Sequence, residues 1–350
     1  VRSLLTLRLP ILAWLLTASW PAAAELDKVS IQLKWQHSFQ FAGYYAAIEQ
    51  GYYRDEGLDV SLKEIDFKQD FVEQVLRGES EYGVSDSTLL IYRLKGAPVL
   101  LVNQFFQHSP LVFLSRRESG IVSPYEMAGK KLVFNTTNQG DASLNALLLK
   151  TLGDLAKVEE VEFGDSVYRD FAAGKIDVVS AYSTSQPFLL REQGIEINVI
   201  DPQNYGIDFY GDNFFTTQKE LAAHPDRVAA MSRATVKGWQ YALEHPERII
   251  ELIGKRYNAN LSEAHLKYEA DATRQMMIPE WVPLGSIDPG RYRMSAEYYR
   301  RLGFTETTSV DNDFFYRPSL LEAAVSLPLS AEEKAWIREH PLVIYGAEKD

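Results

Sequence analysis

Groups of polar and aromatic residues directly follow several of the predicted strands. The first such group contains Trp35, His37 and Gln40. The second is the Ser-Asp-Ser-Thr run of residues 85–88, and the third is the Phe-Gln-His-Ser run of residues 106–109. Ligands of open α/β sheets bind beyond the carboxyl ends of the strands. These groups are therefore typical of a site that grips a flat ring and hydrogen-bonds its edge.

The side chains that we expect to contact a ligand share a place at such strand ends or beside the crossings between two halves of the chain. They are Trp35, His37, Gln40, Ser85, Asp86, Ser87, Gln107, His108, Asn138, Tyr182, Tyr205 and Asp208. We expect Trp35 and Tyr182 to stack on the faces of the ligand and His37, with Gln107 and Ser87, to bind its edge. An alternative stays open for Asp86 and Ser87, which are equally suited to cap the next helix.

Composition excludes several kinds of chemistry. The chain has no cysteine, which rules out disulfides, iron–sulfur clusters and thiol nucleophiles. Its six histidines show no spacing typical of a metal site, and no pair of carboxylates is marked out for acid–base catalysis. The net charge of −12 disfavours nucleic acid and anionic membranes as partners. We expect ligand binding without catalysis, with no cofactor and no metal.

The elements that must position these residues alternate between short apolar strands and amphipathic helices. A chain of 350 residues is long enough for two lobes. The pattern predicts an α/β protein made of two lobes with C-terminal helices. Strands are predicted over residues 29–35, 58–65, 82–85, 99–106, 131–134, 158–163, 176–180 and 197–200, crossings over 111–115 and 210–216, and C-terminal helices over 225–244, 248–257, 263–276 and 294–302.

Domain boundaries follow from this alternation. Residues 28–115 and 213–318 are predicted to form lobe 1, and residues 116–212 to form lobe 2. Residues 1–24 have a positive start, a short apolar stretch and an Ala-Ala-Ala end, which predicts a signal peptide and a periplasmic location. An uncleaved membrane anchor is the alternative.

Residues 33–60, LKWQHSFQFAGYYAAIEQGYYRDEGLDV, resemble the bacterial SsuA/THI5-like (NMT1-like) family of solute-binding proteins. The W-x-H-x-x-Q-F-A-G-[YF]-Y stretch is the specific part, and the resemblance covers nearly all of residues 28–316. It implies an α/β chain with the type II periplasmic binding protein fold, made of two lobes with a hinge and C-terminal helices. It also implies a periplasmic ligand such as a pyrimidine thiamin precursor, riboflavin or a related heterocycle. It also implies an aromatic pocket at Trp35 and His37, with residues 85–87 on the opposite wall. Fungal synthases of this group have histidine where this chain has Phe41, and a cysteine-rich motif that it lacks, so the enzymatic version is not expected.

Residues 329–350, LSAEEKAWIREHPLVIYGAEKD, are similar to the start of a family 3 extracellular solute-binding domain. Two such domains in tandem are the layout of membrane sensors, so this resemblance implies the input domain of a histidine kinase or diguanylate cyclase. A stand-alone binding protein that delivers the heterocycle to an ABC transporter is the alternative. The chain would then contact a membrane only through a permease or through further segments of a longer chain.

The stacking hypothesis is testable by replacing Trp35 or Tyr182 with alanine. Each replacement should weaken ligand binding by about 1 kcal/mol beyond the loss of buried area, because an offset ring contact disappears. Titration calorimetry measures the affinity, and unchanged affinity in both variants would contradict the stacking hypothesis.

Overall fold

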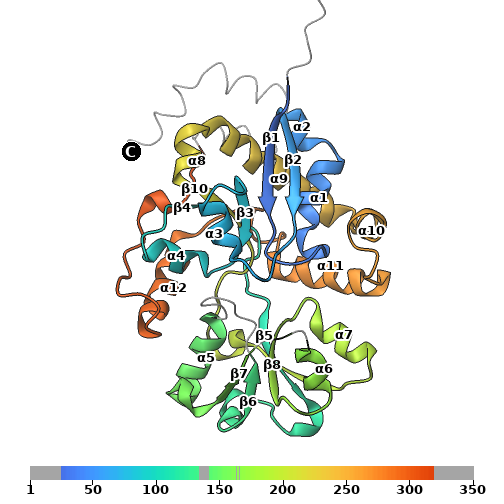
Figure 1. The fold of residues 1–350 in the computed structure, drawn as a ribbon, viewed down its shortest axis with the longest axis vertical. Coiled ribbons are helices and arrows are strands. Elements are labelled where there is room, and N and C mark those ends of the chain that lie inside the picture. Colours follow the sequence, from blue (N-terminus) through green and yellow to red (C-terminus); the bar gives the residue numbers. More distant parts are fainter. Residues whose placement is uncertain (1–24, 134–141, 163, 165, 319–350) are drawn as a thin grey trace, which may run out of the picture.

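A computed structural model describes residues 25–133, 142–162, 164 and 166–318. Within them the chain forms two lobes, each built on a five-stranded sheet, one above the other in Figure 1. The predicted signal peptide, Asn138 and the predicted second domain of residues 329–350 lie outside the described residues. No helix within the described ranges is long and apolar enough to cross a membrane.

The sheet of lobe 1 has the order β2-β1-β3-β10-β4. β1 is parallel to β2 and β3, whereas β10 is antiparallel to both β3 and β4. The carboxyl ends of β1 and β3 and the start of β10 therefore share the edge that faces lobe 2 (Figure 1). The strands are β1 (Asp27–Gln32), β2 (Leu58–Lys63), β3 (Tyr82–Ser85), β4 (Val99–Gln104) and β10 (Asn213–Thr217).

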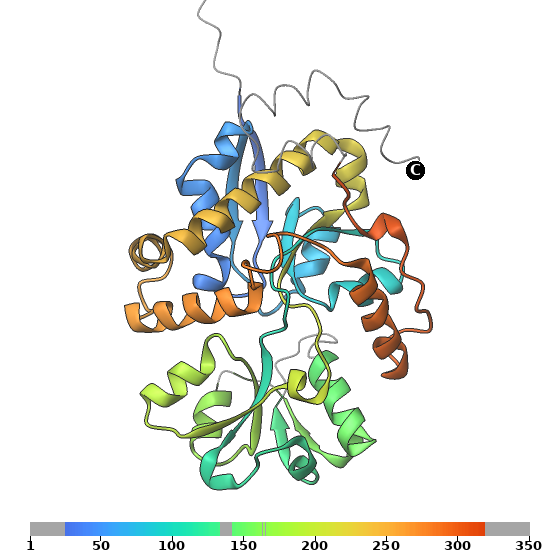
Figure 2. The ribbon, with the colours of Figure 1, turned by 180° about the vertical axis from the view of Figure 1, so that it is seen from behind.

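Helices cover both faces of this sheet, and the C-terminal helices return to it as predicted (Figures 1 and 2). The long helix α9 runs diagonally across the face seen in Figure 2. The helical elements of lobe 1 are η1 (Phe39–Phe41), α1 (Ala42–Glu49), α2 (Tyr52–Asp55), α3 (Phe71–Leu76), α4 (Leu89–Leu94), α8 (Gln218–Ala223), α9 (Pro225–Glu244), α10 (Pro246–Leu252), the π-helix η6 (Ile253–Tyr257), α11 (Glu263–Met277), α12 (Pro289–Arg301) and η7 (Asn312–Phe314).

The sheet of lobe 2 has the order β7-β6-β8-β5-β9. Its strands are β5 (Leu111–Arg116), β6 (Lys131–Val133), β7 (Glu159–Val161), β8 (Val178–Tyr182) and β9 (Ile197–Ile200), and its helical elements are η2 (Arg117–Ser119), η3 (Pro124–Met127), α5 (Ala142–Leu152), η4 (Leu155–Lys157), α6 (Val167–Ala172), α7 (Gln186–Glu192) and η5 (Pro202–Tyr205).

Residues 111–115, which the sequence predicts to cross between lobes, instead lie inside the second sheet. They form β5, which pairs antiparallel with β8 and β9. Val112 and Leu114 are buried in the core of lobe 2. The apolar residues that were predicted to form a crossing therefore form a strand inside the sheet, between β8 and β9. In the same way residues 213–216 belong to β10 of lobe 1. The crossings are the segments between β4 and β5 and between β9 and β10.

Two glycines bring α1 and α9 into close contact. A Cβ atom added to Gly238 would lie 2.1 Å from the carbonyl oxygen of Gly43, and one added to Gly43 would lie 2.3 Å from the Trp239 ring. Neither position has room for a side chain, so the helices approach backbone to backbone. This contact fixes α1 behind β1 and therefore positions the loop that follows β1.

Replacing Gly238 with alanine should destabilise the chain by about 1–3 kcal/mol, because the added methyl group overpacks this contact. Gly254 is the matched control, since a Cβ atom there meets nothing within 4 Å. Gly254→Ala should leave the stability unchanged or raise it slightly. Urea denaturation measures both variants, and equal stabilities would contradict the role of the glycine contact.

Candidate functional site

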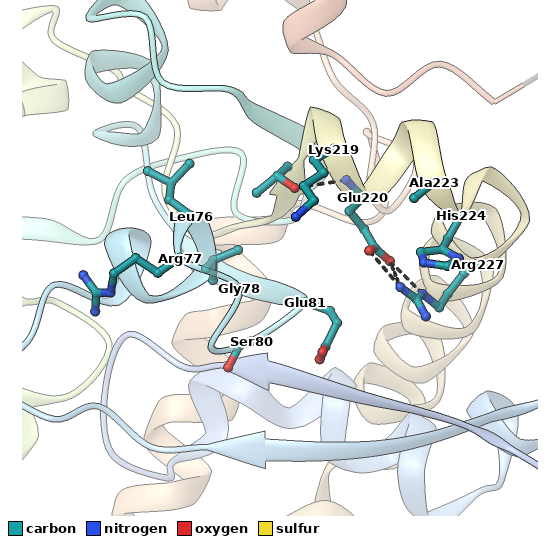
Figure 3. Close-up of a pocket in the computed structure, with 12 residues that line it drawn as sticks. Leu76, Arg77, Gly78, Ser80, Glu81, Lys219, Glu220, Ala223, His224 and Arg227 are labelled. Carbon is teal, nitrogen blue, oxygen red and sulfur yellow. Dashed lines mark hydrogen bonds and ion pairs between the residues drawn. The ribbon is translucent and has the colours of Figure 1, made fainter.

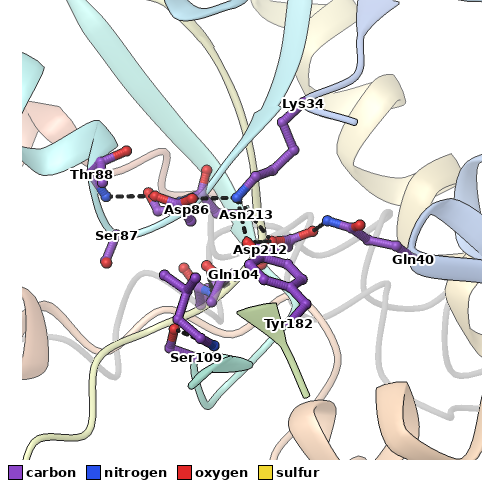
Figure 4. A network of polar contacts seen from close by, with 12 residues as sticks. Lys34, Gln40, Asp86, Ser87, Thr88, Gln104, Ser109, Tyr182, Asp212 and Asn213 are labelled. Atoms are coloured by element: carbon purple, nitrogen blue, oxygen red, sulfur yellow. Dashed lines mark hydrogen bonds and ion pairs between the residues drawn. The ribbon is translucent and has the colours of Figure 1, made fainter. Parts of the chain in front are cut away.

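A buried lysine lies where the two lobes meet (Figure 4). Lys34 follows β1, and its side chain is 9% exposed. Its ammonium group donates a hydrogen bond to Asp86, which follows β3, and lies 3.4 Å from Oδ1 of Asp212, which precedes β10. It also donates to the hydroxyl of Tyr182, at 2.6 Å, and Tyr182 ends β8 of lobe 2. The cluster of Lys34, Asp86, Tyr182 and Asp212, called here the junction cluster, therefore joins the strand ends of both sheets.

Further hydrogen bonds hold the two carboxylates of the junction cluster. Gln40 donates from Nε2 to Oδ2 of Asp212 at 2.6 Å, and the Tyr182 hydroxyl donates to Oδ1 at 3.2 Å. The backbone N–H of Thr88 donates to Oδ1 of Asp86 at 2.9 Å in the turn before α4. The cap position of α4 is Thr88, whose side chain makes no capping hydrogen bond. Neither Asp86 nor Ser87 therefore stands at the cap position that the sequence offered them, and the Asp86 carboxylate binds Lys34.

The electrostatics of the junction cluster give its two carboxylates different pKa shifts. Burial acts to lower the pKa of Lys34, but the charges of Asp212 and Asp86 outweigh it and hold that pKa well above its usual value. Burial acts to raise the pKa of Asp86, yet the attraction of Lys34 leaves it below the usual value. Burial prevails at Asp212, whose pKa is raised despite Lys34 and Gln40. The cluster thus pairs a firmly charged cation and anion with a second acid that accepts a proton more readily.

The structure brings together several of the residues that the sequence predicts. Gln40, Asp86 and Tyr182 all take part in the junction cluster or its hydrogen bonds. Ser85 and Ser87 flank Asp86 and are both buried. The hydroxyl of Ser85 is buried and has no hydrogen-bond partner within the described ranges.

Trp35 and His37 are engaged elsewhere in lobe 1. The Trp35 ring meets Phe67 edge to face at a centroid distance of 5.2 Å. Nδ1 of His37 lies 2.9 Å from the Tyr45 hydroxyl, and the His37 ring packs against both Tyr45 and Tyr257. Their predicted contacts with a ligand stay predictions.

The predicted ligand-binding residues in and beside the two crossings form hydrogen bonds with nearby protein groups. Gln107 donates to the backbone oxygen atoms of Gln104 and Ser286, at 3.2 and 3.3 Å. Nδ1 of His108 lies 2.8 Å from Asp208, which also accepts a hydrogen bond from Arg291. The backbone oxygen of Tyr205 accepts from Lys150. These contacts tie the crossing segments to their neighbours, and none of them reaches the junction cluster.

Lys34 and Asp212 were missed by the sequence-based prediction. Lys34 stands between Leu33 and Trp35 at the end of a predicted strand, and a charge in such an apolar setting needs a counter-charge nearby. Asp212 lies in the predicted return crossing, as Asp208 does. That placement was the one available signal for Asp212.

A hollow lies at the opposite edge of the lobe 1 sheet (Figure 3). It has a volume of about 290 Å³ and lies between the end of α3, the start of β3, and helices α8 and α9. Its central charges neutralise each other, because Arg227 binds Glu220 through two hydrogen bonds. It opens at the amino end of β3, away from the edge where such sheets bind ligands. Among the described residues no group of acidic or histidine side chains could hold a metal ion.

Residues 38–249 match the family described as NMT1/THI5 like. The chain belongs to this family. It is 24% identical over 236 residues to the riboflavin-binding protein RibY of Chloroflexus aurantiacus, covering 66% of this chain and 67% of the relative. It is 25% identical over 234 residues to the formylaminopyrimidine-binding protein of Halalkalibacterium halodurans, covering 65% and 70%.

The fold also matches a solved structure, the alkanesulfonate-binding protein SsuA of Xanthomonas axonopodis pv. citri bound to MOPS. The TM-score is 0.64 at 14% identity, and the match covers 85% of this chain and all of the other. This likeness confirms the predicted α/β fold of a periplasmic binding protein, with two lobes and a hinge.

Replacing Lys34 with methionine should lower the free energy of unfolding by about 3 kcal/mol, because two buried carboxylates then lose their cation. The matched control is Lys255→Met, since Lys255 is 70% exposed in a surface ion pair and should contribute little. Urea denaturation at neutral pH measures both. Equal stability of the Lys34 variant and the unmodified chain would contradict the buried ion cluster.

Proposed function

We propose that the chain binds a small, flat heterocycle at the junction of its lobes, outside the cytoplasm, and releases it unchanged. The observation that carries this proposal is the junction cluster, in which Lys34, Asp86 and Asp212 of lobe 1 meet Tyr182 of lobe 2. Buried, hydrogen-bonding groups from two lobes at the carboxyl ends of their strands are the arrangement expected of a ligand site in this fold.

The chemistry of the cluster indicates which ligand edges it accepts. Asp86 and Asp212 offer carboxylate oxygens to N–H donors, and Gln40 and Lys34 offer N–H groups to ring nitrogens or carbonyl oxygens. An aminopyrimidine presents the complementary donor and acceptor side by side, and the imide edge of a flavin presents a similar pattern. The names of the two relatives, which bind riboflavin and formylaminopyrimidine, support this ligand class.

Tyr182 connects binding to movement of the lobes. It belongs to β8 and moves with lobe 2, so its hydrogen bonds to Lys34 and Asp212 form only when the lobes are together. A ligand that binds both lobes favours the closed arrangement and shifts the equilibrium towards it.

The choice between signalling and transport depends on residues beyond the described ranges. The input-domain role is predicted from residues 329–350, and the ABC transporter role is its alternative. Both stay predictions. A location outside the cytoplasm is proposed from the predicted signal peptide and from the fold of periplasmic binding proteins.

Titration calorimetry with formylaminopyrimidine, riboflavin and MOPS tests the proposal. At least one of the two heterocycles should bind, and at 100 times its dissociation constant it should add about 2.7 kcal/mol of stability in a melting experiment. MOPS should not bind, because its sulfonate would face two carboxylates. Binding of MOPS alone, or of none of the three, would contradict the proposed ligand class.

Asp212→Asn should weaken binding of that heterocycle by about 1.5–3 kcal/mol, because hydrogen bonds to a charged group are lost. Asp271→Asn is the matched control, since Asp271 is exposed on α11. It should bind like the unmodified chain. Equal affinity of both variants would exclude the junction cluster as the binding site.

A further inference from the structure

A second contact joins the lobes at the ends of helices α11 and α7, which face each other in Figure 1. Nε2 of His265 on α11 lies 2.9 Å from the hydroxyl of Ser185, directly before α7. The Phe188 ring of α7 stacks parallel to the His265 ring, with centroids 5.5 Å apart. One residue before Glu269, Tyr268 donates to the backbone oxygen of Ser183 at 2.8 Å. Lobe 2 thus presents a hydroxyl, a ring and a carbonyl to a single face of α11.

Glu269 connects this contact to the loop beside the proposed ligand site. It lies one turn after His265, with 3.5 Å between Oε1 and Nε2, and both side chains are at most 5% exposed. Its Oε2 accepts a hydrogen bond of 2.9 Å from the backbone N–H of Phe39 in η1. The next residue, Gln40, holds Asp212 of the junction cluster. His265 and Glu269 therefore link lobe 2 to the loop that supports the site.

We propose that His265 and Glu269 are positioning residues for lobe closure. They hold lobe 2 against α11 and keep η1 in place beside the junction cluster, and the pair is called here the latch. Only the effect of the latch on ligand affinity rests on the proposed function. Lobe closure is measurable without any ligand, so the test of the latch is independent of the test of ligand binding.

The two residues take up protons in opposite ways when the lobes close. Burial raises the pKa of Glu269 to about 7, although hydrogen bonds from the Phe39 N–H and the Ser185 hydroxyl oppose it. Burial lowers the pKa of His265 from its usual 6.5. When the lobes part, water reaches both groups and both pKa values move back towards 4.5 and 6.5. Glu269 thus binds its proton more tightly in the closed form, and His265 binds its proton more tightly in the open form.

The sign of each effect follows from linkage. As pH falls through about 7, protonation of Glu269 favours closure. As pH falls through about 6.5, protonation of His265 favours opening. At mildly acidic pH the closed form carries about one proton on Glu269, and the open form carries about one proton on His265. Closing therefore changes the total number of bound protons little, and the two effects offset each other. Closure should therefore change little with pH as long as both residues are present.

Other ionisable groups near the pair do not disturb this balance. Tyr45 of α1 and Tyr268 of α11 face it, and burial raises the pKa of each away from neutrality. The guanidinium group of Arg191 on α7 lies beside Tyr268. The η1 segment has no ionisable side chain, and those of α10, which packs on α11, are all exposed.

The test measures the distance between lobes with spin labels in the absence of ligand. The chain has no cysteine, so Asp59→Cys on β2 and Glu160→Cys on β7, both exposed, give one label on each lobe. Pulsed electron paramagnetic resonance between about pH 5.5 and pH 8 should show a closed-to-open ratio that varies by no more than about threefold. In Glu269→Gln the ratio should fall with acid, by up to about tenfold per pH unit below 6.5. In His265→Gln it should rise with acid, by up to about tenfold per pH unit below 7.

Two further variants make the result decisive. Glu263→Gln is the matched control, because Glu263 is exposed on the same helix and pairs with Lys267, so its pH profile should match that of the unmodified chain. Ser185→Ala removes the contact from the lobe 2 side and should lower the closed fraction at every pH, even if a Glu269 variant fails to fold. Flat profiles in both Glu269→Gln and His265→Gln, slopes of the same sign, or an unchanged closed fraction in Ser185→Ala would overturn the proposal.

Discussion

Burial of a single cation organises this molecule. Lys34 is kept charged by Asp86 and Asp212, and its remaining hydrogen bond goes to a hydroxyl of the other lobe. A buried charge is tolerated only when its partners are in place. Contact between the lobes at this point is therefore stabilised by the hydrogen bond from Lys34 to Tyr182. The polar groups that surround the lysine are also suited to bind the edge of a heterocycle.

The rest of the architecture holds those partners at one place. Parallel strands bring the residues after β1 and β3 to the same edge, and the antiparallel β10 delivers Asp212 to that edge from the opposite direction. The glycine contact between α1 and α9 fixes the helix that follows the Lys34 loop. On the far side α11 holds η1 through Glu269, so the loop is supported from two directions. Closure of lobe 2 then completes both the junction cluster and the α11 contact.

Local signals in the sequence predicted much of this fold. β3, β9 and α9 have the bounds that alternation, capping and proline placement indicate, because those signals lie within each element. Whether residues 111–115 cross between lobes or pair within a sheet is decided by distant strands, and there the prediction was wrong. The site shows the same division. Gln40, Asp86 and Tyr182 were expected from their strand ends, whereas Lys34 and Asp212, separated by 178 positions, gain their role only from folding.

A crystal structure of the chain with the heterocycle that binds it would show directly whether the junction cluster holds the ligand. We expect the ring to lie between the lobes, with its nitrogen atoms within hydrogen-bond distance of Asp86 or Asp212 and with Tyr182 closed over it. A ring bound in the hollow beside α8, or between the lobes without contact to either carboxylate, would contradict it.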